Sequence, residues 1–299
     1  MKYKKLKKWT TLLTCATALT VMTACSQSSS QATGTTSSTT SKTSAVTATT
    51  SKKTNKNNSN YFTSKDLDTS YDESSASKIK LSGSSADVSG DGVAVSGSTV
   101  TISKAGTYVI SGKSDGVQIK VDAGDSDDVH IVLDGVTMTN TNAAINATKA
   151  GHVYLTLKDG TTNTLSDSSS NSDEDADAVI FSKGDLTING SGTLNIDAKK
   201  NNGIKANDSL HMTGGTYKIT SVGDAFNVND ELNITGTTMT IEAEEDAVKV
   251  DNDDDTSAGT MYLSDNTMTI KAGDDGIHAS GDLIIDSGTY KVSKNTTRR

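Results

Sequence analysis

The greater part of this sequence has no cysteine and no tryptophan. The only cysteines are Cys15 and Cys25, and the only tryptophan is Trp9. These absences exclude a disulfide framework, a cysteine-based zinc site and thiol catalysis beyond residue 25. Aromatic residues make up only 4% of the chain, so a ligand would have to be recognised mostly through polar groups.

The chain also lacks a hydrophobic run that matches a membrane span of about 20 apolar residues. A basic segment, Met1–Lys8, is followed by a short apolar and Thr-rich stretch, which is typical of a secretory signal. The end of that stretch, Met22-Thr23-Ala24-Cys25, resembles a bacterial lipobox. We therefore predict a lipoprotein signal peptide over residues 1–24, lipidation of Cys25 and a location on the extracellular face of the cell membrane. Ordinary secretion after Ala16-Thr17-Ala18 is the alternative.

Positive charge is scarce after residue 60. The whole chain carries a net charge of -9, but residues 61–299 carry -18, because the nine lysines of the first 60 residues are accompanied by no acidic residue. This argues against nucleic-acid binding, which needs Lys and Arg to neutralise phosphates. An acidic body suits multivalent cations, or ligands that are bound through them.

The segment after Cys25 is dominated by hydroxyl side chains. Of residues 25–60, 20 of 36 are Ser or Thr. Such a segment has little apolar surface to offset the entropy of ordering, which predicts a flexible tether. We place this linker over residues 25–77, although residues 61–77 support no firm structural prediction, and we place the folded domain over residues 78–299.

From residue 78 onward the sequence repeats with a period of about 22 residues. A short motif of Asn or Asp, a small residue and a hydrophobic residue recurs, and its hydrophobic members are 22, 22 and 29 residues apart: Ile204, Phe226, Val248 and Ile277. A second ladder consists of Leu194, Tyr217, Met239, Met268 and Tyr290. A third consists of Leu186, Leu210, Leu232, Leu263 and Leu283. Self-similarity at a fixed period of this size indicates a solenoid.

Three short alternating runs within each repeat identify the kind of solenoid. Leu210-His211-Met212, Tyr217-Lys218-Ile219 and Phe226-Asn227-Val228 alternate with period two, which is typical of strands with one buried face. Gly, Asn and Asp separate these runs, and no window has a helical period. We therefore predict an all-β fold, a single-stranded parallel β-helix with about 22 residues per coil. Alternation also places Tyr217 and Tyr290 in the core rather than on a sugar-stacking surface.

Residues 78–293 carry a resemblance as well. The runs SGTLNIDAKKNNGIKANDSLHMTGGTYKITSVGDAFNVNDELNITG and TMTIKAGDDGIHASGDLIIDSGTY resemble a bacterial family of carbohydrate-binding parallel β-helix proteins. The resemblance implies a right-handed β-helix similar in shape to pectate lyases, which binds calcium and polysaccharides of the cellulose and pectin kind, with no established lyase activity. The family's Asp-Gly-Ile motif is intact only at Asp275-Gly276-Ile277, and we expect the last coil, Leu283–Val292, to expose strand edges.

Aspartates recur at one position of successive coils. Asp224, Asp246 and Asp275 would stack about 5 Å apart, where each like-charge pair costs about 3 kcal/mol at an effective dielectric constant of 20. A shared calcium ion would relieve this repulsion, and we add the adjacent Asp274 to the predicted metal ligands. The alternative is that Asp simply suits tight turns at these positions.

An acidic insertion in the longest repeat is a second candidate for calcium. Asp251, Asp253 and Asp255 follow an Asp-x-Asp-x-Asp spacing common in calcium loops, although the glycine and the distal glutamate of an EF-hand are absent. We expect this loop to emerge next to Asp246; a solvated acidic loop is the alternative. The acidic cluster 173–177 is a further candidate.

Four residues are predicted to bind the ligand: Lys205, Lys249, Asn227 and His278. Each lysine follows the buried member of its motif, so alternation directs it outward, where it could bind a uronate carboxylate. A lysine beside calcium is also what a pectate lyase needs to remove a proton next to such a carboxylate. A solvated surface lysine explains the same pattern, and we assign no catalytic residue.

Three functions remain open at this point. The leading one is a non-catalytic, calcium-dependent polysaccharide-binding lipoprotein whose ligand is an acidic or plant-type glycan. The others are a calcium-dependent polysaccharide lyase and a structural or adhesive β-helix. All three predict calcium; the first two predict a polysaccharide partner, a membrane contact only through the lipid anchor, and no nucleic acid. The sequence gives no indication of a protein partner.

Overall fold

The computed structural model describes residues 46–50 and 58–296. The predicted signal peptide, Cys25 and most of the predicted linker lie outside these residues. Within them, the only helical element is a 3-10 turn, η1 (Asn58–Asn60), and no helix is long and apolar enough to cross a membrane.

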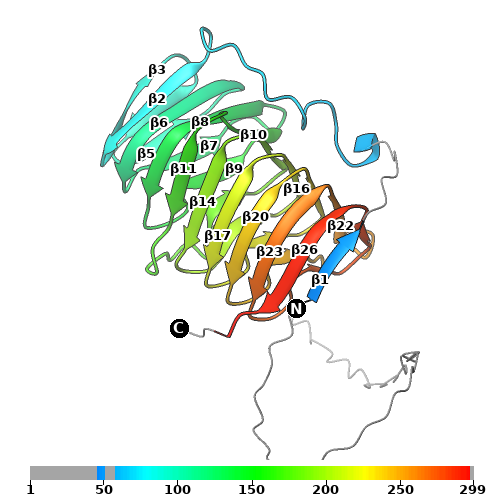
Figure 1. The fold of residues 1–299 in the computed structure, drawn as a ribbon. Coiled ribbons are helices and arrows are strands. Elements are labelled where there is room, and N and C mark those ends of the chain that lie inside the picture. Colours follow the sequence, from blue (N-terminus) through cyan, green and yellow to red (C-terminus); the bar gives the residue numbers. More distant parts are fainter. Residues whose placement is uncertain (1–45, 51–57, 297–299) are drawn as a thin grey trace, which may run out of the picture. The chain divides into compact units, whose positions relative to one another are not determined.

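The chain winds into a solenoid of stacked coils (Figure 1). One coil consists of β15 (Asn202–Ala206), β16 (Ser209–Thr213) and β17 (Thr216–Ser221). Each of these strands pairs in parallel with the equivalent strand of the next coil. The all-β prediction with parallel β-helix stacking is confirmed, and right-handed winding stays a prediction.

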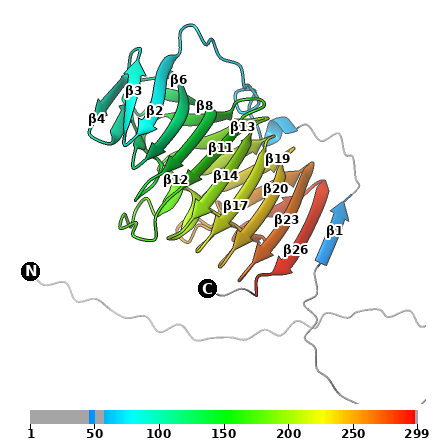
Figure 2. The ribbon, with the colours of Figure 1, turned by 60° about the vertical axis from the view of Figure 1, so that its left-hand side comes forward.

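Three strands per coil give the solenoid three faces. Figure 2 shows the stacked coils from a second side. The face formed by the 9-stranded sheet is called the lysine face: β4 (Val93–Ser96), β5 (Thr99–Ile102), β7 (Gln118–Asp122), β9 (Ile145–Lys149), β12 (Ala178–Ser182), β15, β18 (Phe226–Val228), β21 (Val248–Val250) and β24 (His278–Ala279).

The second face, called the strap face, contains β10 (His152–Leu157), β13 (Leu186–Gly190), β16, β19 (Glu231–Thr235), β22 (Thr260–Ser264) and β25 (Leu283–Ile285). The third, called the groove face, contains β11 (Thr162–Ser166), β14 (Thr193–Ala198), β17, β20 (Thr238–Ala243), β23 (Asn266–Ala272) and β26 (Gly288–Lys294). The first coils are less regular. They contain β2 (Ser77–Gly83), β3 (Ser85–Ser89), β6 (Gly106–Asp115) and β8 (Asp128–Thr139), of which β8 pairs with both β10 and β11.

The predicted ladders form the core. Tyr217 pairs with Leu194 in one neighbouring coil and Met239 in the other, and it is fully buried as predicted. One rung of the third ladder was assigned wrongly. Met261, not Leu263, pairs with Leu232, because both residues are hydrophobic and alternate on the same strand, so spacing alone cannot choose between them.

The turns between the strap face and the groove face need a left-handed backbone. Gly214 and Gly236 occupy this position with φ of 74° and 66°. In the next coil Asp265 stands there with φ of 53°, the single positive-φ residue other than glycine in the described part of the chain. Its backbone N–H donates to Ser287 Oγ, and Ser287 Oγ donates back to Asp265 Oδ1, at 2.8 and 2.9 Å. This local bonding offsets the strain of the left-handed conformation.

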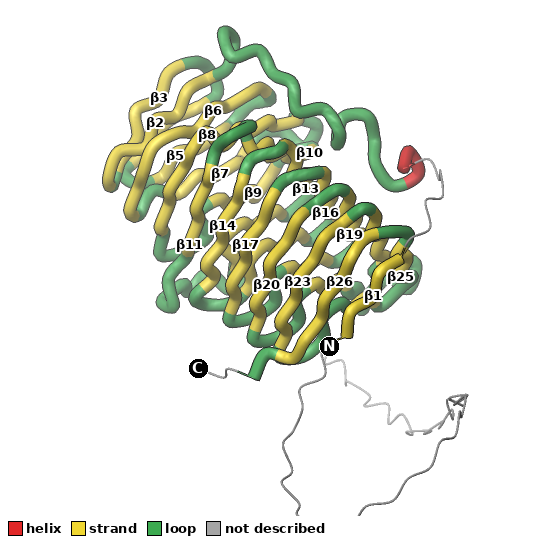
Figure 3. The backbone as a smooth tube through the Cα atoms, in the orientation of Figure 1, coloured by secondary structure: helices red, strands yellow, loops and turns green. Residues whose placement is uncertain are grey.

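Residues 61–76, called the strap, precede β2 and run along the solenoid across successive coils (Figure 3). Phe62 and Asp66 are only 3% and 1% exposed. The ordered body therefore starts before residue 78, in contrast to the predicted flexible linker over 25–77. The sequence signal was weak because the strap has few apolar residues and packs mainly through hydrogen bonds.

The last coil is partly covered by the chain itself. β1 (Val46–Thr50) pairs antiparallel with β26, from Val46 opposite Val292 to Thr50 opposite Gly288. The predicted exposed edge is therefore covered on the groove face. On the strap face it is not, and Leu283 of β25 is 44% exposed.

Candidate functional site

The four predicted ligand-binding residues lie in one row on the lysine face. Lys205 pairs with Asn227, Asn227 with Lys249, and Lys249 with His278 in the strand register. Adjacent strands are about 4.8 Å apart, so the two lysines are separated by about 10 Å. The alternation of buried and partly exposed residues along β15, β18 and β21 directs Lys205, Asn227 and Lys249 outward. His278, on the two-residue strand β24, is partly exposed.

Both lysines are anchored by carboxylates at the edge of this face. The Lys205 ammonium lies 2.7 Å from Asp177 Oδ1, and both side chains keep about a fifth of their surface exposed. The Lys249 ammonium lies 3.8 and 3.9 Å from the Asp224 and Asp246 carboxylates. Such pairs hold the cationic groups in place on the surface while part of each lysine side chain stays exposed.

The predicted aspartate ladder is present, and its carboxylates bond to the turns. Asp224 Oδ1 accepts the backbone N–H of Asp246 at 3.0 Å, and Asp246 Oδ1 accepts that of Asp275 at 2.8 Å. Asp224 Oδ2 also accepts a 2.6 Å hydrogen bond from the Asn227 amide. Burial raises the pKa of Asp224, although its hydrogen bonds with Asn227 and Asp246 oppose that shift. Lys249 and the backbone N–H groups thus offset the negative charge of these aspartates, a role that the sequence-based prediction gave to calcium.

The outer members of the ladder are different. Asp274 and Asp275 are exposed, and Asp275 Oδ2 contacts His278 Nδ1 at 3.4 Å. Within residues 46–50 and 58–296, no group of three or more His, Cys, Asp or Glu side chains is arranged to hold a metal ion.

The acidic insertion lies at the other edge of the lysine face. Residues 251–259 follow β21, whereas Asp246 precedes it, so the two predicted calcium clusters are separated by the length of that strand. The insertion is fixed by Asn252, whose amide donates to Asp230 Oδ1 at 2.6 Å and whose N–H donates to Ser280. The expectation that the loop emerges next to Asp246 was wrong, because a three-residue strand intervenes.

Sequence reasoning missed a second stacked row of acids at this edge. Asp185, Asp208 and Asp230 follow β12, β15 and β18 respectively. Burial raises the pKa of Asp208, and the neighbouring Asp185 and Asp230 carboxylates raise it further. Aligning the residues after each buried motif, as was done for the residues before it, would have found this row.

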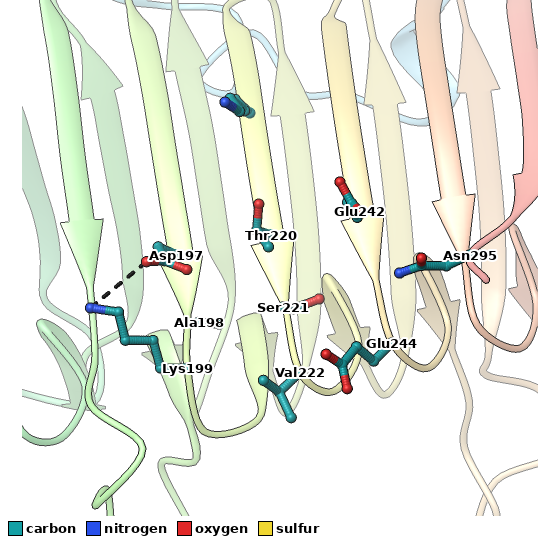
Figure 4. A pocket seen from close by; sticks show the side chains of 10 residues that line it. Asp197, Ala198, Lys199, Thr220, Ser221, Val222, Glu242, Glu244 and Asn295 are labelled. Carbon is teal, nitrogen blue, oxygen red and sulfur yellow. Dashed lines mark ion pairs between the residues drawn. The ribbon is translucent and has the colours of Figure 1, made fainter. Parts of the chain in front are cut away.

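The groove face contains a hollow that no predicted residue lines. It has a volume of about 320 Å³ and crosses β14, β17 and β20 (Figure 4). Charged side chains of both signs surround it, including Asp197, Lys199, Lys218, Glu242 and Glu244. A second hollow of about 440 Å³ shares Asp197, Lys218 and Thr220 with it, so the two are adjacent. These residues repeat with the strands but carry no distinctive motif, which is why the sequence did not single them out.

Residues 96–299 match the family described as carbohydrate-binding domain-containing protein. A protein of that description from Acetivibrio thermocellus is 38% identical over 124 residues, which are 40% of this chain and 43% of the relative. The match thus spans less than half the length of that relative.

A solved structure is similar to most of the chain. The polysaccharide lyase-like protein from C. thermocellum, determined as a gadolinium derivative, superposes with a TM-score of 0.66 and 29% identity, covering 74% of this chain and 97% of that one. The family match, which extends over more than half of the chain, and this shared solenoid agree with the predicted resemblance. The chain belongs to the family of carbohydrate-binding domain-containing proteins.

Proposed function

We propose that this protein is a surface-anchored, non-catalytic, calcium-dependent polysaccharide-binding lipoprotein that holds an acidic glycan on its lysine face. The observation that carries the proposal is the single outward row of Lys205, Asn227, Lys249 and His278 in a member of a carbohydrate-binding family. Two lysines about 10 Å apart on a flat strand surface suit a linear polymer that carries regularly spaced carboxylates.

Calcium is proposed as a bridge rather than as a buried structural ion. Asp224 and Asp246 are occupied by backbone N–H groups and lie next to Lys249. Asp274 and Asp275 are exposed and carry oxygens of the kind that calcium prefers. Carboxylates of a uronate polymer would complete the coordination. The acidic insertion, with Asp251, Asp253 and Asp255, is a second place for the same ion chemistry.

The anchoring part of the proposal rests on the sequence alone. Cys25 within Met22-Thr23-Ala24-Cys25 would carry the lipid, and the Ser- and Thr-rich segment would hold the solenoid away from the membrane. Incorporation of labelled palmitate into the wild-type protein, and its loss in Cys25→Ala, would support lipidation. Equal labelling of both proteins contradicts it.

A lyase is the second candidate, favoured by the name of the solved relative, which is polysaccharide lyase-like. It requires a lysine to act as base next to a bound uronate. Here each lysine of the row lies in an ion pair with one or two carboxylates, which suits an anion-binding role better than proton abstraction.

The test measures binding and cleavage together. The protein is incubated with polygalacturonate and with cellulose, in calcium and in chelator, and depletion of protein from solution is followed beside the absorbance of unsaturated uronate products. Depletion by polygalacturonate in calcium without new absorbance supports the proposal. Rising absorbance that Lys205→Gln or Lys249→Gln abolishes makes the protein a lyase. Calcium-dependent stability with no glycan retained indicates a structural solenoid.

A further inference from the structure

The strap face has an outward row with its own ligand chemistry. Tyr154 pairs with Thr187, Thr187 with His211, His211 with Asn233, and Asn233 with Tyr262. The row therefore has an aromatic ring at each end and a histidine in the middle, about 10 Å from either ring at the ordinary spacing of strands. The strap covers this row in the structure.

The middle of the row holds a carboxylate. Asp66 of the strap accepts hydrogen bonds from Thr187 at 2.5 Å and from His211 at 3.2 Å. Burial opposes the charged form of His211, but hydrogen bonds to Asp66 and Glu231 outweigh it and raise the pKa of His211 to about 9. This position is therefore an anion site, built from a cationic imidazole and a hydroxyl and occupied by the chain's own carboxylate.

At the β22 end of the row, the Tyr262 ring contacts an aromatic ring of the strap. Tyr61 stacks on Tyr262 with ring centroids 3.7 Å apart and planes 4° from parallel. Stacking of a flat ring at this distance is the contact that an aromatic side chain offers to any planar or apolar ring face. At the other end, the Lys65 ammonium lies 4.7 Å above the Tyr154 ring. Both platforms are thus in contact with strap residues.

Amides of the strap face bind the strap backbone. Asn189 Nδ2 donates to the carbonyls of Asp66 and Asp68 at 3.2 and 3.0 Å, and Asn233 Nδ2 donates to the Tyr61 carbonyl at 2.9 Å. Thr213 donates to the Asp66 carbonyl. These amide and hydroxyl donors contact carbonyl oxygens of the strap, and they need only acceptors, which the oxygens of a glycan also provide.

The covered row continues into open hollows beside the strap. One of about 270 Å³ is lined by Tyr154, His130 and Thr107 of the solenoid together with Lys65 of the strap. Another, of about 350 Å³, lies between Leu67 of the strap and the Thr213 and Thr235 strand ends. The family match starts at residue 96 and so excludes the strap, although it includes every residue of the row beneath it.

We propose that the strap face is a second site for an acidic polysaccharide, and that the strap fills this site as an internal mimic, with Asp66 in the place of a uronate carboxylate and Tyr61 in the place of a sugar ring. The class of ligand rests on the proposed function, whereas the site itself does not share a residue with the lysine face. A glycan reaches this site by displacing the strap. Its apparent affinity is reduced by the fraction of molecules in which the strap is docked, so a strap that is docked in 99% of molecules weakens binding about 100-fold.

The test opens the strap in a protein whose lysine face has been disabled. The full chain carries Lys205→Gln and Lys249→Gln, with and without the strap substitutions Phe62→Ser and Asp66→Asn, which change no residue of the solenoid. Hydrogen exchange of residues 61–71 verifies opening, and calorimetric titration with oligogalacturonate and with neutral cello-oligosaccharide measures affinity. Opening is expected to strengthen oligogalacturonate binding at least about tenfold, and Tyr154→Ala or His211→Gln in the opened chain is expected to remove that gain.

Three results would overturn the proposal. An opened strap without a gain in affinity makes the strap a structural cover alone. Equal gains for both oligosaccharides remove the carboxylate site at His211. If the substitutions leave the strap docked, exchange of residues 61–71 is followed while oligogalacturonate is added to the chain with only the lysine face disabled. Faster exchange supports the proposal, and unchanged exchange at about 100 times the concentration that saturates the wild-type protein contradicts it. Failure of the lysine-face site is measured separately, since Lys205→Gln and Lys249→Gln then leave the wild-type affinity unchanged.

Discussion

The lysine face and the strap face each carry a row of outward polar side chains on the same coils. The two rows differ in the partners of these side chains and in their exposure to solvent. On the lysine face, Lys205 and Lys249 find carboxylate partners in the neighbouring turns and stay partly exposed. On the strap face, Thr187 and His211 are covered by a segment that is distant in sequence, and its carboxylate is buried with them. One row is partly exposed and the other is covered, so alternation identifies outward residues without showing which of them meet solvent.

The largest expected difference between the two faces concerns two aspartates that each contact a histidine. Asp66 lies 3.2 Å from His211 and is 1% exposed, whereas the Asp275 side chain lies 3.4 Å from His278 and is 62% exposed. Asp66→Ala leaves Thr187 and His211 without their buried acceptor, and we expect it to lower the free energy of unfolding by about 3–5 kcal/mol. Asp275→Ala is expected to cost about 0.5 kcal/mol or less. Urea unfolding measures both, and equal losses would show that the strap contact is not a buried one.

The pH dependence of stability distinguishes the two histidines next. The folded-state pKa of His211 is raised from 6.5 to about 9, so its contribution is fully present below pH 6.5 and is lost as the pH rises through about 9. A shift of this size corresponds to about 3 kcal/mol. We expect His211→Gln to flatten the fall in unfolding free energy between pH 6.5 and 9, and His278→Gln to leave that fall unchanged. A wild-type protein of constant stability over this range contradicts the prediction.

At low pH the contact between the strap and the strap face weakens because Asp66 becomes protonated. Burial opposes ionisation of Asp66, but hydrogen bonds from His211, Thr187 and Thr63 outweigh it and hold its pKa well below the usual 3.8. Its contribution is therefore present above pH 3.8 and is lost as the pH falls below that value. Exchange protection of residues 61–71 should decline over the same range, before the core strands lose protection.

For glycan binding, in contrast to stability, we expect substitutions on the lysine face to have the larger effect. Lys205→Gln together with Lys249→Gln is expected to weaken polygalacturonate binding by about 10- to 100-fold, or about 1.4 to 2.8 kcal/mol. Lys218→Gln, on the exposed surface of the groove face, is the matched control and should change little. Calorimetric titration decides between them, and a loss confined to Lys218→Gln would move the glycan site to the groove face.

The smallest expected effect is that of calcium on stability. An ion present at ten times its dissociation constant stabilises the folded state by about 1.4 kcal/mol. Asp274→Asn with Asp275→Asn should remove this gain, while Asp253→Asn tests the insertion at the opposite edge of the lysine face. Because the proposed bridge takes glycan oxygens as ligands, thermal unfolding is measured with oligogalacturonate present, in calcium and in chelator. If only Asp253→Asn reduces it, the ion binds at the insertion.

The repeat pattern predicted most of the solenoid because each buried rung needs a hydrophobic residue at a fixed interval. Leu194, Tyr217 and Met239 could be aligned for this reason, and the same spacing brought Lys205 and Lys249 into one row. The strap could not be found in this way. Asp66 and Tyr61 pack across strands rather than along them, and their partners are more than 100 positions away in the chain. Contacts of that kind leave no period in the sequence.

The partners of the Asp224 carboxylate could not be predicted from the sequence either. Spacing placed this carboxylate beside Asp246 and suggested a shared cation, but it gave no information about the backbone N–H of the next coil or about the reach of Lys249. Both compensate the charge inside the protein, so the repulsion that motivated the calcium prediction is largely relieved within the fold itself.

The role of the lysine face is measured most directly by the binding of polygalacturonate to the wild-type protein and to Lys205→Gln with Lys249→Gln, in calcium and in chelator, with product absorbance recorded throughout. We expect calcium-dependent binding by the wild-type protein, weaker binding by the variant and no unsaturated product from either. Undiminished binding by a folded variant, or absorbance that rises with time, would contradict it.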